Sequence, residues 1–160
     1  MYSNNKYQQF LEIQGPGGTG KSTLVELIVL KLGHQNVHIT NLAVLENSKF
    51  ETANLLNKKL VVINDSVQYA GSISVLKALI GQDMLNMERK HENAASPFQP
   101  YCLLIIVSNE FLSLRDHTTG LKRRRIPFII SSKERVDTGD LSLIDYLRSE
   151  IPEFTSYILK

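Results

Sequence analysis

Eight residues near the start of the chain decide its fold: Gly15-Pro16-Gly17-Gly18-Thr19-Gly20-Lys21-Ser22. They satisfy the pattern G-x-x-x-x-G-K-S/T, and the residues on both sides fit the structural context of that pattern. Residues 10–13 have the composition of a strand, and residues 22–32 carry apolar side chains at helical spacing before a capping Gly33. A glycine-rich turn there points backbone N–H groups inward, and the helix adds its positive dipole end. The sequence therefore predicts a phosphate-binding loop.

The pattern also predicts a role for each part of this loop. Lys21 is expected to reach the β and γ phosphates of ATP, and the Ser22 hydroxyl is expected to ligate Mg²⁺. The predicted ATP-binding residues are Gly15, Pro16, Gly17, Gly18, Thr19, Gly20, Lys21, Ser22 and Thr23. A glycine-rich turn with a chance lysine is the alternative, but it does not account for the strand and the helix on either side.

A second apolar run ends in polar residues: Lys59-Leu60-Val61-Val62-Ile63-Asn64-Asp65. A P-loop ATPase needs a carboxylate at the end of a neighbouring strand to hold the metal's water shell, so Asp65 is predicted as the metal-side carboxylate. The alternative is a turn or N-cap aspartate after a buried strand. Many related ATPases follow this aspartate with a glutamate, whereas here Ser66 follows. Asn64 and Asp65 sharing the polarisation of water, or Glu110 contributing to it, both remain open.

The wider pattern predicts an α/β fold, a three-layer P-loop NTPase core with a mostly parallel central sheet. Short apolar runs alternate with helical patterns, and consecutive apolar residues are typical of strands covered on both faces. Strands are predicted at 10–13, 37–39, 60–63, 103–107 and 126–130, with Pro127 marking an edge strand. Helices are predicted at 22–32, 74–80 and 141–147, with Asp140 as an N-cap, and Pro152 is predicted to open a last short helix.

Composition narrows the class of protein. A chain of 160 residues with 42% hydrophobic and 21% charged residues fits one globular domain, and no apolar run reaches the roughly 18 residues of a membrane helix. The N-terminus lacks an apolar secretion signal, and the single Cys102 excludes an internal disulfide, so a reducing, cytoplasmic or organellar compartment is predicted. The net charge of +2 does not by itself indicate nucleic acid. Two basic clusters stand out, at 89–91 and 122–125.

Further motifs follow these two along the chain. After the acidic strand comes a segment at 75–91, then an apolar strand ending in Ser108-Asn109-Glu110, and then Gly120-Leu121-Lys122-Arg123-Arg124-Arg125-Ile126-Pro127-Phe128. This order resembles that of superfamily 3 helicases, which are of the AAA+ type: Walker A, Walker B, B′ segment, motif C and arginine finger. The match is closest to the primase-associated helicases of phages and plasmids, and it covers residues 9–128.

The resemblance implies a set of catalytic residues. Asn109 would be the sensor at its strand end, and Arg125 would be the arginine finger that reaches the ATP of a neighbouring subunit, with Arg124 as the second choice. Together with the residues above, the predicted catalytic set is Lys21, Asn64, Asp65, Asn109, Arg124 and Arg125. A plain solvated basic turn is the alternative for 122–125.

The resemblance also implies partners. Members of the family work as rings, usually hexamers, on single-stranded DNA, so a homo-hexamer with ATP sites between subunits is expected, together with a primase domain or partner. Arg89, Lys90 and His91 are similar to the DNA-binding hairpin of papillomavirus replication helicases; an ordinary charged turn is the alternative. Residues 1–160 would then be the ATPase domain of a longer replication protein, with a projecting β-hairpin.

Three functions follow from these patterns. The first is an ATP-driven helicase motor that translocates on single-stranded DNA during replication of a phage, plasmid or similar replicon. The second is a nucleotide-dependent DNA-binding or assembly module with weak ATPase activity, which the missing glutamate after Asp65 favours. The third is a small P-loop kinase of metabolites, which the length and the loop allow.

Overall fold

The computed structural model describes residues 7–64, 69–88, 96–112, 120–131 and 142–158, the last five of them by their backbone alone. Within this part of the chain, five strands form one sheet in the order β2-β3-β6-β1-β7, and every neighbouring pair is parallel. The strands are β1 (Phe10–Gln14), β2 (Val37–Thr40), β3 (Leu60–Asn64), β6 (Leu103–Ser108) and β7 (Arg125–Ile129). The predicted fold class and all five predicted strands are confirmed, with β7 at the sheet edge.

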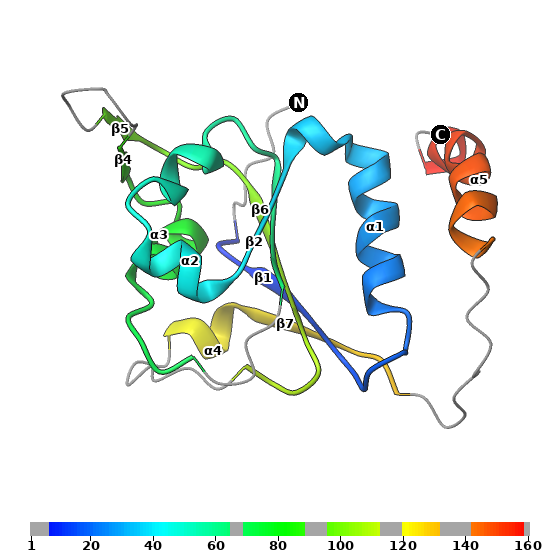
Figure 1. The fold of residues 1–160 in the computed structure, drawn as a ribbon, viewed down its shortest axis with the longest axis horizontal. Helices are drawn as coiled ribbons and strands as arrows, with labels where there is room; N and C mark the ends of the chain where they lie inside the picture. Colours follow the sequence, from blue (N-terminus) through cyan, green and yellow to red (C-terminus); the bar gives the residue numbers. More distant parts are fainter. Residues whose placement is uncertain (1–6, 65–68, 89–95, 113–119, 132–141, 159–160) are drawn as a thin grey trace.

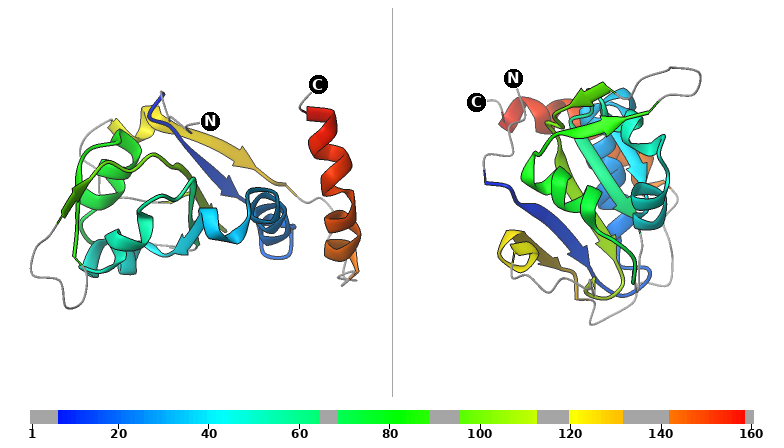
Figure 2. Two further views of the ribbon diagram at one scale, coloured as in Figure 1. Left: turned by 90° about the horizontal axis from the view of Figure 1, so that it is seen from above. Right: turned by 90° about the vertical axis from the view of Figure 1, so that its left-hand side faces the viewer.

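Helices cover both faces of this sheet (Figure 1). Helix α1 (Lys21–Leu32) lies on one face, and α5 (Leu143–Ile158) packs on its outer side. Helices α2 (Leu42–Asn47) and α3 (Ser74–Gly81) lie on the other face. The view from above in Figure 2 shows these layers, with the sheet between them. None of the described helices is long and apolar enough to span a bilayer.

Three smaller elements complete the described chain. The short 3-10 helices η1 (His34–Asn36) and η2 (Glu51–Leu55) precede β2 and β3. Strands β4 (Leu85–Met87) and β5 (Ser96–Phe98) pair antiparallel, at the upper left of Figure 1, so the expected hairpin is present. Helix α4 (Gly120–Arg124) leads directly into β7, and the sequence analysis did not predict this helix.

The C-terminal helix corrects one prediction. Instead of a helix at 141–147 and a second one opened by Pro152, the chain forms one continuous helix, α5, with Pro152 inside it. Asp140 and Leu141 lie outside the described residues. Proline costs an internal helix one N–H hydrogen bond and introduces a steric clash. On the side toward α1, Leu147 and Ile151 of α5 face Leu24, Leu27 and Ile28 of α1 across an apolar space.

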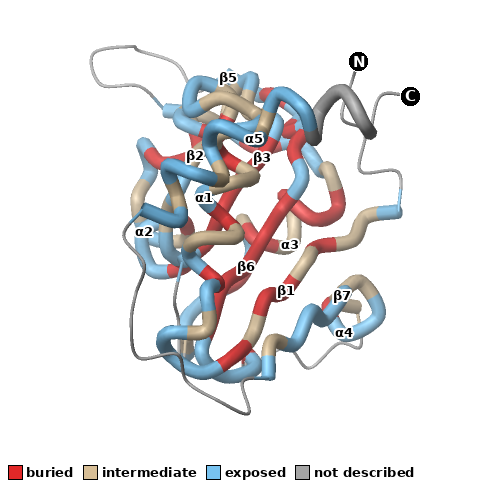
Figure 3. The backbone as a smooth tube through the Cα atoms, turned by 90° about the vertical axis from the view of Figure 1, so that its right-hand side faces the viewer, coloured by how far each residue is buried: buried red, intermediate tan, exposed pale blue. Residues whose placement is uncertain are grey.

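Two apolar clusters fill the space between the sheet and its helices. The Val61 and Ile63 side chains belong to the cluster under α2 and α3, whereas Leu60 and Val62 belong to the cluster under α1. Because successive strand residues point to opposite faces, burial on both faces explains the continuous apolar runs in β3 and β6. Figure 3 shows these central strands buried, with β7 and α4 largely exposed beside them.

Glu46 of α2 fixes the start of α3. The residue before α3, Ile73, supplies no side-chain cap. The Glu46 carboxylate accepts hydrogen bonds from the Val75 N–H (3.1 Å) and the Leu76 N–H (2.8 Å) instead. A negative charge at a helix N-terminus also interacts favourably with the helix dipole. Glu46 thus joins the two helices on this face and sets the position of the helix that leads into the hairpin.

We expect Glu46→Ala to lower the free energy of unfolding by about 1–2 kcal/mol, because two helix N–H groups lose their acceptor. Chemical denaturation measures this change. The matched control is Glu88→Ala, which removes a carboxylate from an exposed position. Equal stability of Glu46→Ala and Glu88→Ala would show that the cap contributes nothing.

Candidate phosphate-binding site

The carboxyl ends of β1, β3 and β6 meet at one edge of the sheet. Gln14 pairs with Ser108, and Val107 pairs with Asn64, so the three strands end within one residue of the same level. The glycine-rich loop therefore begins at the level where Asn109 follows β6. Asp65, the residue after Asn64, lies outside the described residues. The structure thus brings the loop, Asn64 and Asn109 to the same edge, as the sequence predicted.

The loop turns into α1 through two glycines with left-handed backbone angles. Gly18 has φ 77° and Gly20 has φ 82°, a region that residues with a Cβ rarely adopt. Gly20 is also the N-cap of α1, where it supplies no side-chain hydrogen bond, and the first turn of α1 carries no acidic residue. The N–H groups and positive dipole end of α1 therefore lack an anionic partner from their own first turn, and this arrangement favours a bound anion.

The Lys21 side chain folds back over this loop. Its ammonium donates hydrogen bonds to the backbone oxygens of Gly15 (2.6 Å) and Pro16 (2.8 Å), and the residue is only 8% exposed. The Thr19 hydroxyl also donates to the Pro16 oxygen, at 2.8 Å. These bonds hold a positive charge above the loop without neutralising it. A phosphate in the loop would replace carbonyl oxygens with charged ones as the partners of Lys21, which makes stronger hydrogen bonds.

Ser22 and Asn64 line the same hollow between α1 and the sheet. The hollow has a volume of about 220 Å³, and Val25, Glu26, Val29, His34 and Ile39 complete its lining. Ser22 and Asn64 are both exposed, so their oxygens are accessible from solvent. A serine hydroxyl with nearby amide and carboxylate oxygens is the type of ligand set that Mg²⁺ accepts. The predicted magnesium pair, Ser22 and Asp65, is thus compatible with the described half of the site.

Two polar side chains that the sequence analysis did not select lie beneath this edge. Ser108 is 3% exposed, and neither its Oγ nor Oε1 of Gln14 has a hydrogen-bond partner among the described residues. The two residues are register partners at the ends of β6 and β1. Their positions at the polar ends of apolar strands were a usable signal. They add hydrogen-bonding groups at the strand ends. Ser108 follows Val107, the register partner of Asn64.

The basic cluster lies at the opposite edge of the sheet. Arg125 pairs with Phe10 at the start of β1, whereas Ile129 pairs with Gln14 at its end. Four strand rises of about 3.3 Å, roughly 13 Å in total, separate these levels. Helix α4 and its basic residues lie beyond Arg125, farther still from the glycine-rich loop, as Figure 1 shows at the lower left. The cluster therefore does not line the loop of its own chain.

The Arg125 side chain contacts two residues of its own chain, and its predicted role as an arginine finger stays a prediction. Its Nε lies 2.9 Å from Oε2 of Glu12, which is fully buried, and its Nη2 donates to the Leu112 oxygen at 3.0 Å. The Arg125 guanidinium is thus engaged inside its own chain. Arg124 donates to Oε1 of Gln8 at 2.7 Å. Arg123 is exposed and makes no hydrogen bond or ion pair with any residue that the structure describes.

The predicted DNA-binding residues lie outside the described part of the chain. Arg89, Lys90 and His91 fall between β4 and β5, whose pairing is described. At the base of the hairpin, the Gln99 side chain donates to the Gln82 oxygen at 2.9 Å. The structure therefore confirms the antiparallel strand pair that flanks these residues in the sequence, and their role stays a prediction.

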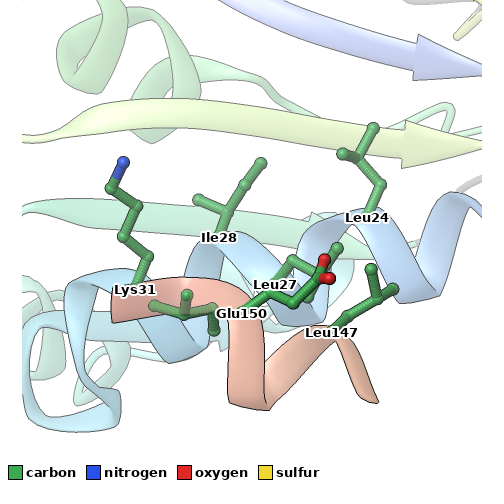
Figure 4. Close-up of a pocket in the computed structure, with 7 residues that line it drawn as sticks. Leu24, Leu27, Ile28, Lys31, Leu147 and Glu150 are labelled. Carbon is green, nitrogen blue, oxygen red and sulfur yellow. The ribbon is translucent and has the colours of Figure 1, made fainter. Parts of the chain in front are cut away.

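A larger hollow, of about 310 Å³, lies between α1 and α5 and is almost entirely apolar (Figure 4). Its polar residues are Lys31 and Glu150, and it has none of the loop's features for holding phosphate.

Cys102 is also unsuited to chemistry. It is 2% exposed, as predicted for a core thiol, and burial raises its pKa to about 11.

The sheet and its loop define an α/β P-loop protein, and comparison with solved structures shows that the fold is helicase-like. The apo A form of the NrS-1 C-terminal region has a TM-score of 0.71 at 22% identity, covering 94% of this chain and 36% of that chain. JCV helicase bound to a thiazolopyridine compound has a TM-score of 0.53 at 21% identity, covering 94% and 42%.

The chain belongs to the family of unknown function DUF5906, whose model matches residues 13–125. It is also 36% identical over 69 residues to the uncharacterized mitochondrial protein ymf20 of Marchantia polymorpha, a match that covers 43% of this chain and 41% of that protein. The chain covers well under half the length of each of these proteins.

Gly15 provides a test of the loop geometry. A Cβ at this position would lie 2.5 Å from the Ile130 oxygen, whose residue also donates its N–H to the Gln14 oxygen at 2.7 Å. We expect Gly15→Ala to lower the melting temperature by several degrees, because β1 and the end of β7 must move apart. Gly17→Ala is the matched control, since its Cβ would meet nothing within 4 Å. Equal melting temperatures for the two variants would contradict the close approach.

Proposed function

We propose that this chain is the motor domain of an ATP-dependent DNA helicase, which hydrolyses ATP and translocates on single-stranded DNA during replication of a phage, plasmid or similar replicon. The observation that carries the proposal is the glycine-rich loop at the start of α1, with a cationic Lys21 and no acidic residue in the first helical turn. The helicase-like fold and the edge shared with Asn64 and Asn109 support it.

The residues of the loop would bind the nucleotide as follows. Backbone N–H groups of 17–22 and the Lys21 ammonium would hold the β and γ phosphates. Ser22 and Asp65 would hold Mg²⁺, which neutralises charge on the phosphates when bound. Asn109 would orient water or contact the γ phosphate from the neighbouring strand end. The buried Ser108 and the buried Oε1 of Gln14 supply further groups that can hydrogen-bond to Asn109 or to water.

A ring would complete the site. Because α4 lies at the end of the sheet opposite the loop, its cations would act on the nucleotide of another subunit. Such a cation neutralises charge that builds on the γ phosphate, and arginine fingers are worth about 10³–10⁵ in rate. Arg123 is exposed, whereas Arg124 and Arg125 have partners within the chain, so Arg123 is the arginine of α4 most available for this task. A homo-hexamer is the expected assembly, with a primase as domain or partner.

The DNA contact is assigned to the hairpin. Lys90 and its neighbours would bind the phosphates of a strand in the ring channel, and His91 would donate to phosphate or stack on a base. The name of ymf20 also makes an organellar replicon a candidate alongside a phage or plasmid in the cytoplasm.

One sequence feature favours a second function. Ser66 stands where many related ATPases carry the glutamate that polarises water. A DNA-binding or assembly module that binds nucleotide and hydrolyses it slowly would fit this substitution. Turnover with and without single-stranded DNA separates the two functions: a motor is stimulated by DNA, and a module of this kind is not.

The first test is Lys21→Ala, which removes the cation held over the loop. We expect turnover to disappear and affinity for ATP to fall by at least about tenfold, since phosphate loses a charge-assisted donor. Lys49→Ala, at an exposed position away from the loop, is the control. Hydrolysis and nucleotide binding are measured on both variants. Wild-type turnover in Lys21→Ala would contradict the assignment of the loop.

The second test concerns DNA. We expect Lys90→Ala and His91→Ala to weaken binding of single-stranded DNA while leaving ATP affinity unchanged, and Lys90→Ala to reduce the dependence of binding on salt. Fluorescence anisotropy at several salt concentrations measures both effects. Unchanged DNA affinity in both variants would contradict the DNA-binding role and favour the alternative, an ordinary charged turn at 89–91.

A further inference from the structure

Glu12 is a buried carboxylate at the centre of β1 that the chemistry above does not use. It is 0% exposed, and the apolar residues Leu11 and Ile13 flank it in the sequence. An ionised carboxylate in such a place is costly unless other groups compensate it. Its position, on the strand that leads into the glycine-rich loop, therefore needs a physical explanation.

Two segments that are distant in sequence meet at Glu12. Its Oε1 accepts the Leu112 N–H at 2.7 Å, and its Oε2 lies 2.9 Å from Nε of Arg125. Arg125 closes the triangle by donating from Nη2 to the Leu112 oxygen at 3.0 Å. Oε2 and Nε are close but not aligned as a hydrogen bond, so their contact is chiefly one of charge. Both backbone groups of Leu112 are thus held by one ion pair.

Each of these segments leads to a group in the proposed ATP chemistry. Leu112 stands three residues after Asn109, and its side chain is buried in the same cluster as Leu121 of α4. Arg125 follows α4 directly, so its position fixes the helix that presents Arg123. The Glu12 contacts therefore join the sensor segment of one ATP site to the helix that would serve the next.

We infer that Glu12 and Arg125 are positioning residues, which hold the segment 109–112 and helix α4 in one arrangement so that Arg123 is correctly placed for the neighbouring subunit's ATP. This inference rests on the proposed function. It assigns Arg125 a role within its own chain, where the resemblance suggested a finger. Contiguous contacts alone do not demonstrate coupling. The test must therefore measure the effect of Glu12 on ATP hydrolysis in a neighbouring subunit, separately from its effect on the ATP site of its own chain.

Mixed assemblies make that separation. Subunits with Lys21→Ala cannot use their own ATP but keep α4, and subunits with Arg123→Ala keep their ATP site but lack the cation. Neither should hydrolyse ATP alone, and mixing them should restore a clear fraction of wild-type turnover. When Lys21→Ala/Glu12→Gln subunits are used instead, the restored turnover should be at least about tenfold lower. The glutamine side chain still accepts the Leu112 N–H, but it lacks the charge that faces Arg125.

A readout without ATP accompanies this experiment. Amide hydrogen exchange at Leu112 should be faster in Glu12→Ala than in the wild type, with Glu12→Gln between them, because the amide oxygen can still accept the N–H. Light scattering of each mixture checks that the subunits assemble equally. If Glu12→Gln does not fold, Arg125→Lys replaces it, since lysine keeps the charge and loses the donor to the Leu112 oxygen.

The outcomes are distinct. Equal rescue by Lys21→Ala and by Lys21→Ala/Glu12→Gln in assemblies of the same mass would overturn the positioning role, while the proposed function would stand. Absence of any rescue by Lys21→Ala would mean that α4 does not act on a neighbour. In that case the in-trans part of the proposed function fails first, and the role of Glu12 fails with it.

Discussion

All strands of the sheet run parallel, and the site depends on this constraint. Parallel strands place their carboxyl ends at one edge of the sheet. Polar residues that follow separate apolar runs therefore come together even though they are far apart in the sequence. Here β6 lies between β1 and β3. Asn109 consequently follows a strand whose neighbours lead into the glycine-rich loop and to Asn64. Apolar clusters on both faces hold the central strands β3 and β6 in the sheet.

The same constraint explains what the sequence could predict. Strands covered on both faces appear as unbroken apolar runs, and β3 and β6 were recognisable for that reason. The glycine-rich loop was recognisable because its spacing, strand and helix agree. Small elements escaped because their signals are short. Helix α2 has six residues and an Asn41 cap that accepts the Val44 N–H at 2.9 Å, but no apolar periodicity long enough to detect. The continuous α5 was predicted wrongly because Pro152 was given its local preference for the first turn of a helix, whereas it lies inside α5.

For the candidate site, the sequence indicated where residues of the motifs lie in the fold, but it did not indicate contacts that depend on the tertiary structure. Lys21, Ser22, Asn64 and Asn109 lie where the motifs imply. Glu12 gave little signal, as one acidic residue in an apolar strand, and the basic cluster gave no indication that Arg125 contacts Glu12. Glu12 and Arg125 both contact Leu112, which lies 100 residues from Glu12 along the chain. No local pattern contains that contact.

The amino-terminal edge of the sheet shows how charge can be kept in place without being neutralised. Of the three consecutive arginines, Arg125 faces a carboxylate and Arg124 faces the neutral side chain of Gln8, at 2.7 Å. Gln8 in turn donates to the Gly81 oxygen at 3.0 Å, at the end of the helix that leads into the hairpin. Arg124 is therefore oriented by an amide oxygen that leaves its charge intact, and Arg123 next to it remains exposed. Since solvent and salt screen the field of an exposed cation, its effect on a bound phosphate depends on how rigidly its helix presents it. The contacts of Arg124, in α4, and of Arg125, directly after it, hold this helix in place at the end of the sheet farthest from the chain's own loop.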